Sequence, residues 1–506
     1  MDPQPVGMTR RTLLRRAGAV VFAAVVGSSL VNTQAHAADT KPYQLGSDKH
    51  LFIDEFLISN KQNVTLCVNP PQRKELVIIP DRPWERNGIT SYCNVFWDPH
   101  TRQYRLYYVP IHLDSNPAYR LAMAVSKDGI HWDKPNLGAV EWQGSKQNNI
   151  VIDGQREGTV MIDPKGPPEK RYVFLSSEPR LGTRLFTSPD GVHFTMHPTQ
   201  ISKHHSDSQI STFWDDQLDK YVHYPRVGHR GRATGCVVTS GMDEVWPERI
   251  PVVLSADDRD PSDMDLYTNS AQKYALARNV YVAFPTPYYH YNPSGRAYLN
   301  QPALRAGGKT NDGVIDTQLA VSRDGKAWTR YRTPYVPLYQ HEDLPLKINM
   351  VFPGMVYHKT RIEQYFGGYT FTHGDTQARR RLEGRALGGI FRLEQRIDGF
   401  VSADFAYGGG SLVVGPLVFG GDTLTLNVNT SASGEGRVGL LDEHGKAIAG
   451  FGVADCHIIS GDYLAKRVTW KGKSDVSSLA GRPVRLRFEM RGTRLYAFQF
   501  GKGGDA

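Results

Sequence analysis

A short element that recurs along the chain constrains the fold more than any other feature. Its clearest copies are Ser126–Trp132, Ser188–Phe194 and Ser322–Trp328, each with Asp-Gly at the third and fourth positions. Two degenerate copies, Ser240–Trp246 and Arg396–Phe400, complete the series. The spacing averages about 67 residues, which suits a four-stranded blade with long loops. Because a lone blade cannot bury both of its faces, such repeats pack on their neighbours around a common axis.

A second element lies between these copies. It is a strand, a tight turn and an aromatic-rich strand, as in Asn94–Pro99 followed by Tyr104–Tyr108. The two elements together predict five units, each with four strands. Helical periodicity is almost absent, so the chain is predicted to be all-β. Residues 38–402 are therefore predicted to form a five-bladed β-propeller.

The composition and patterning of the sequence change near residue 403. Gly- and Val-rich alternating segments follow, such as Leu424–Val428, Val484–Phe488 and Leu495–Phe498. Strands of this spacing with turn signals between them are typical of a sandwich. Residues 403–506 are predicted to form a C-terminal β-sandwich.

The first 37 residues indicate export. Paired arginines, Arg10 and Arg11, precede an apolar run from Ala17 to Val31 and a small-x-small site at Ala35–Ala37. This is the pattern of a signal peptide, and the paired arginines resemble a twin-arginine export signal. A membrane anchor is the competing interpretation, but a span needs about 20 apolar residues and the run is shorter. We expect a periplasmic or secreted protein with no membrane association after cleavage of residues 1–37.

Charge and cysteine content exclude several classes of partner. The formal net charge is +9, but no long Lys/Arg run points to nucleic acid. The four cysteines are scattered without zinc-site spacing, and most are expected to be free thiols, with Cys67–Cys93 as the one bridge to consider. The segment Asp257–Asp265 lacks the Gly-punctuated loop of known calcium sites. No cofactor and no metal are predicted.

The repeats and motifs resemble those of a known group. The Asp-Gly turns resemble sialidase Asp boxes, and a five-bladed propeller with a sandwich resembles the clan of glycoside hydrolase families 32 and 43. Leu51–Ile58, Asp207–Gln209, Asp316–Ala320 and Leu495–Phe498 resemble exported bacterial proteins described as family-32-like. The resemblance implies an exported glycoside hydrolase. The Asn-Asp-Pro-Asn-Gly and Glu-Cys-Pro motifs of family 32 are absent, so no catalytic residue is carried over from it.

The aspartates of the repeated turns are expected to be structural. A residue that recurs in every blade serves the blade, and an Asp in a tight turn accepts hydrogen bonds from nearby backbone N–H groups. In the family that the turns resemble, they also lie opposite the active face. This applies to Asp128, Asp190, Asp243, Asp324 and Asp398.

Carboxylates that are not repeated are the better catalytic candidates. Glycoside hydrolysis uses one carboxyl as proton donor and a second, ionised one on the opposite side of the bond. Candidates near the predicted strand starts would converge on the axial funnel of a propeller. The predicted catalytic residues are Asp207, Asp265 and Glu342, with Glu85 and Asp54 in reserve.

Sugar binding needs flat apolar faces with hydrogen-bonding edges. Side chains of this kind near predicted loops are Trp84, Gln209, Tyr267, Tyr289, His290, Asp316 and His373. Among them the aromatic run Tyr288–Tyr291, in a loop flanked by Pro and Gly, is the best candidate. The expected partner is a carbohydrate substrate. Three alternatives stay open: a non-catalytic glycan-binding propeller, a polysaccharide lyase with a Tyr or His base, and a protein-interaction propeller.

Overall fold

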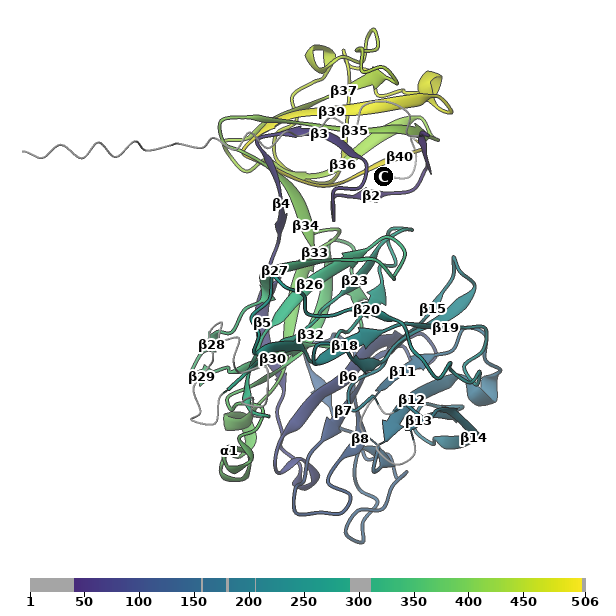
Figure 1. Ribbon diagram of the computed structural model, residues 1–506, viewed down its shortest axis with the longest axis vertical. Helices are drawn as coiled ribbons and strands as arrows, with labels where there is room; N and C mark the ends of the chain where they lie inside the picture. The colour runs from purple at the N-terminus through teal and green to yellow at the C-terminus, as the bar shows by residue number, and fades with distance from the viewer. Residues whose placement is uncertain (1–40, 156–157, 179–181, 205, 292–310, 503–506) are drawn as a thin grey trace, which may run out of the picture. The chain divides into compact units, whose positions relative to one another are not determined.

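The computed structural model describes residues 41–155, 158–178, 182–204, 206–291 and 311–502. The predicted signal peptide, residues 1–37, lies outside these ranges. Strands dominate the described residues, as predicted, and their α-helix is the short α1 (Thr376–Arg381) (Figure 1). Within the same ranges no helix has the length and hydropathy needed to span a bilayer. The chain is all-β.

Two antiparallel arrays begin the repeat region, the first with five strands and the second with four. Most of the paired strands follow one another in sequence. The first array has the order β10 (Ile150–Asp153), β8 (Arg120–Ser126), β7 (Gln103–Pro110) and β6 (Ile89–Asp98), with β9 (Trp132–Asp133) also on β8. The second is β11 (Gly158–Ile162), β12 (Tyr172–Glu178), β13 (Gly182–Ser188) and β14 (Thr195–Ser202).

Two further arrays repeat the pattern. One is β15 (Ser211–Asp215), β16 (Lys220–Tyr224) and β19 (Val237–Thr239), flanked by the small sheet β17 (Arg226–Gly228), β18 (Arg232–Gly235) and β20 (Val252–Leu254). The other is β22 (Gln272–Lys273), β23 (Tyr281–Ala283), β26 (Thr317–Ser322) and β27 (Trp328–Val336).

The last repeat belongs to a larger sheet that the first repeat-region strand completes. Its order is β21 (Met264–Leu266), β24 (Pro287–His290), β25 (Gly313–Ile315), β30 (Ile348–Val351), β32 (Arg361–Tyr369), β33 (Gly388–Arg396) and β5 (Gln72–Ile78), with β31 (Val356–Tyr357) on β32. Because β5 pairs with β33, residues more than 300 positions apart lie side by side (Figure 1).

Hydrogen bonds join the inner segments of the five arrays into a closed circuit. The five bonds are Asn94 Nδ2 to Val160 O (2.6 Å), Thr159 Oγ1 to Ile210 O (2.6 Å), Ser270 Oγ to Gln209 Oε1 (3.1 Å), Gly354 N to Gln272 Oε1 (3.1 Å) and Val95 N to Pro353 O (3.2 Å). The same segments line one cavity of about 290 Å³. Five stretches far apart in sequence therefore surround a common centre.

The repeated Asp-Gly turns share one hydrogen-bond pattern. Asp128 Oδ1 accepts from the N–H groups of Ile130 and His131, both at 2.8 Å, and Asp190 and Asp324 accept in the same way. A tyrosine of another array anchors each turn, as where Tyr365 OH donates to Gly129 O at 2.8 Å. For these three turns the predicted structural role of the Asp is confirmed.

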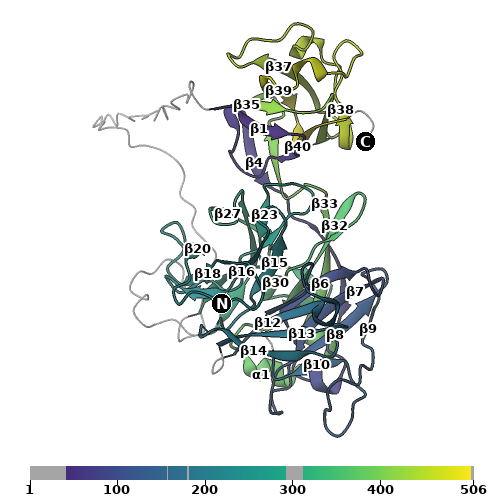
Figure 2. The same ribbon diagram turned by 90° about the vertical axis from the view of Figure 1, so that its right-hand side faces the viewer.

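Strands from both ends of the described chain form two further sheets. One contains β1 (Tyr43–Gly46), β35 (Gly410–Phe419), β39 (Pro483–Arg491) and β37 (Glu435–Asp442), with β3 (Ile58–Gln62) on β35 (Figure 2). The other contains β38 (Asp462–Arg467), β36 (Thr423–Asn429), β40 (Thr493–Gly501), β34 (Val401–Phe405) and β4 (Val64–Val68), with β2 (His50–Leu51) on β40.

A single hydrophobic cluster is shared by these two sheets. Phe52, Leu412, Leu426, Phe488 and Phe498 are almost completely buried in it. The boundaries predicted from the sequence group residues 43–68 with the repeats, whereas their strands pair with strands of residues 401–501.

Cys67, Cys236 and Cys456 are free thiols.

Candidate active site

The strand pair β21–β24 positions the central residues of the candidate site. Asp265 lies directly opposite Tyr288 in the antiparallel register, and Met264 lies opposite Tyr289. Because successive side chains of a strand point to opposite faces, Asp265, Tyr288 and His290 share one face and Tyr289 lies on the other. The first face carries the group that we call the Asp265 cluster: Asp265, Arg232, His290, Tyr288, Tyr267 and His373.

Asp265 is a buried carboxylate with two cationic or potentially cationic neighbours. Its side chain Oδ2 accepts from Arg232 Nη1 and from the Arg232 backbone N–H, both at 3.2 Å, and Oδ1 lies 3.3 Å from His290 Nε2. Burial opposes ionisation, but the contacts with His290 and Arg232 outweigh it and lower the pKa of Asp265. The carboxyl is therefore ionised at neutral pH.

A glycine allows the loop before β18 to approach this carboxylate. Gly231 has a φ of +97°, and a Cβ there would lie 2.7 Å from Cβ of Asp265. Any other residue would push Arg232 away from Asp265. The Arg232 contact thus depends on this one backbone position.

A chain of hydrogen-bonding rings continues from Tyr288. His373 Nδ1 lies 3.2 Å from Tyr288 OH and 3.3 Å from Asn311 O, and His373 Nε2 lies 2.9 Å from Tyr267 OH. Burial lowers the pKa of His373 to about 4, so the ring is neutral at pH 7. Since a carbonyl can only accept, we assign the ring proton to Nδ1, which leaves Nε2 to accept from Tyr267.

Two arginines lie against the ring of Tyr267. Cζ of Arg226 is 5.4 Å from the ring centroid and Cζ of Arg232 is 5.3 Å from it, within cation–π range. Arg226 forms an ion pair with Asp207, as Arg232 does with Asp265. Two carboxylates from different segments are thereby paired with arginines that pack on one aromatic ring.

The cluster has a closed interior and an open edge. Only 3% of Asp265 is exposed, and Tyr288 is fully buried. By contrast, 56% of the Asp207 side chain and 25% of the Arg232 side chain are exposed. A substrate would first meet Asp207 and Arg232.

The structure brings together several of the residues singled out in the sequence. Asp265, Tyr267, His290 and His373 belong to the cluster, and Asp207 is linked to it through Arg226. Gln209 lies close by in sequence but accepts from Ser270 in the closed hydrogen-bond circuit. Gln209 therefore has a structural partner in that circuit.

Asp316 and Tyr289 lie apart from this face. Burial raises the pKa of Asp316 to about 6, and Asp316 Oδ1 has no hydrogen-bond partner among the described residues. Burial, followed by the charge of Asp316, raises the pKa of Tyr289 to about 12. Asp316 and Tyr289 are a second pair of polar residues, and they do not belong to the Asp265 cluster.

The raised pKa of Asp316 predicts a pH-dependent stability. The unfolded carboxyl has a pKa of about 3.9, so between pH 4 and 6 the folded state binds more protons and loses stability as the pH rises. Asp316→Asn should remove this loss and stabilise the protein at pH 7–8 by about 1–3 kcal/mol. Thermal melts from pH 4 to 8 measure the effect. The exposed Asp258→Asn is the control, and a variant profile parallel to the wild type would contradict the prediction.

Glu85 and Trp84 are fixed inside the first array. Glu85 is fully buried; its oxygens accept from Tyr108 OH at 2.6 Å, Lys134 Nζ at 2.7 Å and the backbone N–H groups of Asp81 and Arg82. Trp84 donates from Nε1 to Asn149 Oδ1 at 2.9 Å. These hydrogen-bond partners all belong to the same part of the fold, so we leave both residues outside the proposed site.

Asp54 and Glu342 lie elsewhere. Asp54 pairs with Arg323 at 2.9 Å, and Arg323 directly follows the C-terminal end of β26. Asp316 lies at the other end of β26, and a strand of that length spans about 20 Å. Glu342 sits in the turn between β28 (Gln340–His341) and β29 (Leu344–Pro345), is 72% exposed and pairs with Arg385. Neither reaches the Asp265 cluster.

Three residues of this site are absent from the candidates predicted from the sequence. Tyr288 belongs to the predicted sugar-binding run Tyr288–Tyr291, and strand alternation places it with His290, since they are two positions apart. Arg232, Arg226 and Tyr92, whose OH lies 2.7 Å from Tyr267 OH, carry no signal in an isolated sequence. No group of three or more metal-ligating side chains occurs in the ranges that the structure covers.

Comparisons with known proteins give fold-level likeness alone. No family model matches the chain, and no curated protein does. Three similar solved structures are an N-acetylgalactosamine deacetylase from F. plautii with blood group B trisaccharide, a GH130-family protein from work on glycoside hydrolases that target beta-1,2 mannosidic linkages in Candida mannan, and a glycosyl hydrolase from Bacteroides ovatus. The deacetylase is 13% identical, and the match covers 66% of this chain and 96% of the deacetylase with a TM-score of 0.40. The GH130-family protein is 14% identical, with 65% of this chain and 93% of that protein covered and a TM-score of 0.40. The Bacteroides ovatus protein is 15% identical, with 65% and 93% covered and a TM-score of 0.41. These neighbours are carbohydrate-processing proteins, but likeness at this level carries no argument about the activity of this chain.

Proposed function

We propose that the protein is an exported glycoside hydrolase whose active site is the Asp265 cluster. One observation carries the proposal: Asp207 and Asp265, from different segments, each pair with an arginine that packs against the ring of Tyr267. Paired carboxylates beside an aromatic ring and hydrogen-bonding side chains are what glycosidic cleavage needs. The N-terminal signal pattern supports export to the periplasm or the medium.

The fold proposed around this site is a five-bladed propeller built from residues 72–396, with a sandwich built from residues 43–68 and 401–501. The closed circuit of hydrogen bonds and the shared axial cavity support five blades. In such an arrangement the loops before the innermost strands gather at one end of the axis. Asp207 lies in the loop before β15, and Asp265 of β21 and Tyr267 lie in the segment before β22, so all three precede strands of this kind.

The two carboxylates have different environments. Asp265 is ionised, and it acts as the carboxylate that attacks the anomeric carbon or activates water. Asp207, at the open edge of the cluster, is the second carboxylate of the proposed pair. Tyr267 and His373 hold the sugar ring through stacking and hydrogen bonds.

A polysaccharide lyase is the second candidate, favoured by the Tyr267–His373 contact. Tyr267 OH lies 2.9 Å from His373 Nε2, and the Arg226 and Arg232 guanidiniums lie over the Tyr267 ring. In a lyase, Tyr267 or His373 would act as the base that removes the proton beside a uronate carboxylate. The reaction leaves an unsaturated sugar in place of a hydrolysed one.

A glycan panel distinguishes these candidates. The full-length processed protein is incubated with neutral and uronate-containing polysaccharides, and new reducing ends and ultraviolet absorbance are followed together. Hydrolysis gives reducing ends without absorbance, whereas elimination gives both. Binding without either product would favour the non-catalytic glycan-binding alternative and contradict the proposal.

A further inference from the structure

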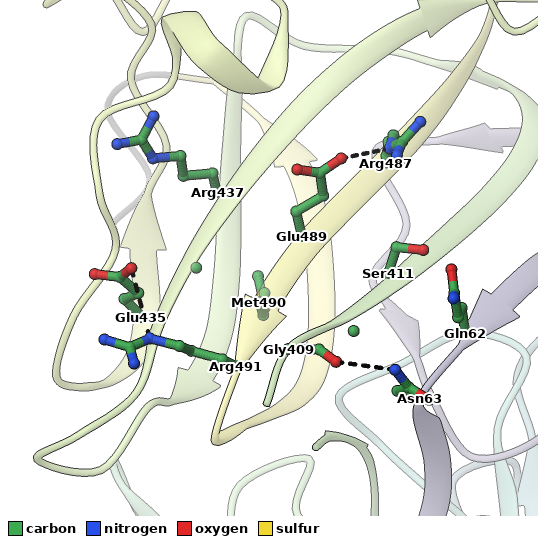
Figure 3. A pocket seen from close by; sticks show the side chains of 12 residues that line it. Gln62, Asn63, Gly409, Ser411, Glu435, Arg437, Arg487, Glu489, Met490 and Arg491 are labelled. Carbon is green, nitrogen blue, oxygen red and sulfur yellow. Dashed lines mark hydrogen bonds and ion pairs between the residues drawn. The ribbon is translucent and has the colours of Figure 1, made fainter. Parts of the chain in front are cut away.

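A polar groove crosses the outer face of the sheet β3–β35–β39–β37. It has a volume of about 500 Å³, and Figure 3 shows the side chains that surround it. They come from segments at both ends of the described chain and include Gln62, Asn63, Ser411, Glu435, Arg437, Arg487, Glu489 and Arg491. None of the residues of the Asp265 cluster lies in this groove.

Three glycines, Gly409, Gly410 and Gly436, also line the groove. A Cβ at Gly410 would lie 2.7 Å from Asn63 O, and a Cβ at Gly436 would lie 2.7 Å from Met490 Cγ. Gly410 and Gly436 both lie opposite the buried Met490, so close packing on the core side of the sheet requires glycine at both positions.

The charges in the groove do not balance. Glu489 pairs with Arg487 at 2.8 Å, and Glu435 pairs with Arg491 at 3.6 Å. Arg437 lies opposite Glu489 in the β37–β39 register, yet its guanidinium points away from that carboxylate (Figure 3). Among the described residues no carboxylate lies within ion-pair distance of Arg437. One positive charge is thus left over beside two neutralised pairs.

We propose that this groove binds an anionic sugar unit, with Arg437 as its anchor. A planar guanidinium with free donors recognises the carboxylate of a uronic acid or a sulfate ester through two parallel hydrogen bonds. The amides of Gln62 and Asn63 and the hydroxyl of Ser411 supply further partners for sugar hydroxyls along the groove. The groove is a second glycan-binding site, separate from the proposed active site.

Affinity electrophoresis of the full processed protein tests this site. The gels contain polygalacturonate, dextran sulfate or neutral mannan, which separate carboxylate from sulfate and anionic from neutral binding. Arg437→Gln should weaken binding to at least one anionic polymer about tenfold. The control is Arg482→Gln, which removes an equal charge at an exposed position outside the groove and should change binding less than about twofold.

Three outcomes would overturn the proposal. The first is that the wild type binds neither anionic polymer. The second is that Arg437→Gln and Arg482→Gln weaken binding equally, which would indicate general charge attraction. The third is that mannan binds as well as the anionic polymers. Turnover of Arg437→Gln on the substrate that the glycan panel identifies is measured in parallel, so failure of the groove and failure of the proposed active site are separate results.

Discussion

Replacing Asp265 with asparagine is expected to lower turnover about 10²–10⁴-fold, the range for loss of a group that acts on the reacting bond. The amide keeps the shape of the carboxyl but loses the negative charge that Arg232 and His290 stabilise. Turnover is measured on whichever polysaccharide the glycan panel identifies. Circular dichroism establishes that the variant is folded, because breaking a buried ion pair also destabilises the protein.

Glu342→Gln is the matched control for this variant. Glu342 is also an acidic side chain among the catalytic candidates predicted from the sequence, but it is exposed and pairs with Arg385 on a surface turn. We expect its turnover to stay within about twofold of the wild type, since exposed ion pairs contribute little. A folded Asp265→Asn protein with full activity would remove the Asp265 cluster from consideration as the active site.

Replacing Glu85 with glutamine is expected to lower the free energy of unfolding by about 3–5 kcal/mol without a specific loss of turnover. The side chain is fully buried, and its carboxylate neutralises Lys134, which is itself buried. A glutamine amide would place N–H groups where the structure supplies donors from Lys134 and from the backbone of Asp81 and Arg82. Thermal and urea unfolding midpoints measure the change.

Asp81→Asn is the control for Glu85. Asp81 contacts the same ammonium group, at 2.6 Å, but from a half-exposed position. Its loss should cost less than about 1 kcal/mol. If Glu85→Gln kept its unfolding midpoint and lost turnover, Glu85 would be a catalytic residue, as its place among the predicted candidates implies.

The repeated turns were predictable because their chemistry is local. Asp128 accepts hydrogen bonds from residues two and three positions ahead, so the short turn sequence itself encodes the contact. The alternation of β24 is also local, and it separates Tyr289 from Tyr288 and His290. Applied to the predicted run Tyr288–Tyr291, that alternation selects Tyr288 and His290 for the candidate site and excludes Tyr289.

The partners of the carboxylates were not predictable in this way. Glu85 and Asp265 are both acidic residues near strand starts, and they differ only in what distant segments bring to them. Lys134 reaches Glu85 from 49 positions away, and Arg232 reaches Asp265 from 33 positions away. Without related sequences to compare, nothing in the chain distinguishes a carboxylate that is fully satisfied from one that borders an accessible edge.

The pairing of β1–β4 with the C-terminal strands has a consequence for biogenesis. The partner strands of residues 43–68 lie between residues 401 and 501. The N-terminal strands therefore cannot form their sheets until almost the whole polypeptide has been synthesised. The last array of the repeat region waits too, because β5 closes it against β33. A stop codon near residue 400 would thus leave orphaned strand edges at the opposite terminus, and no single cut between the two regions would release an intact C-terminal module.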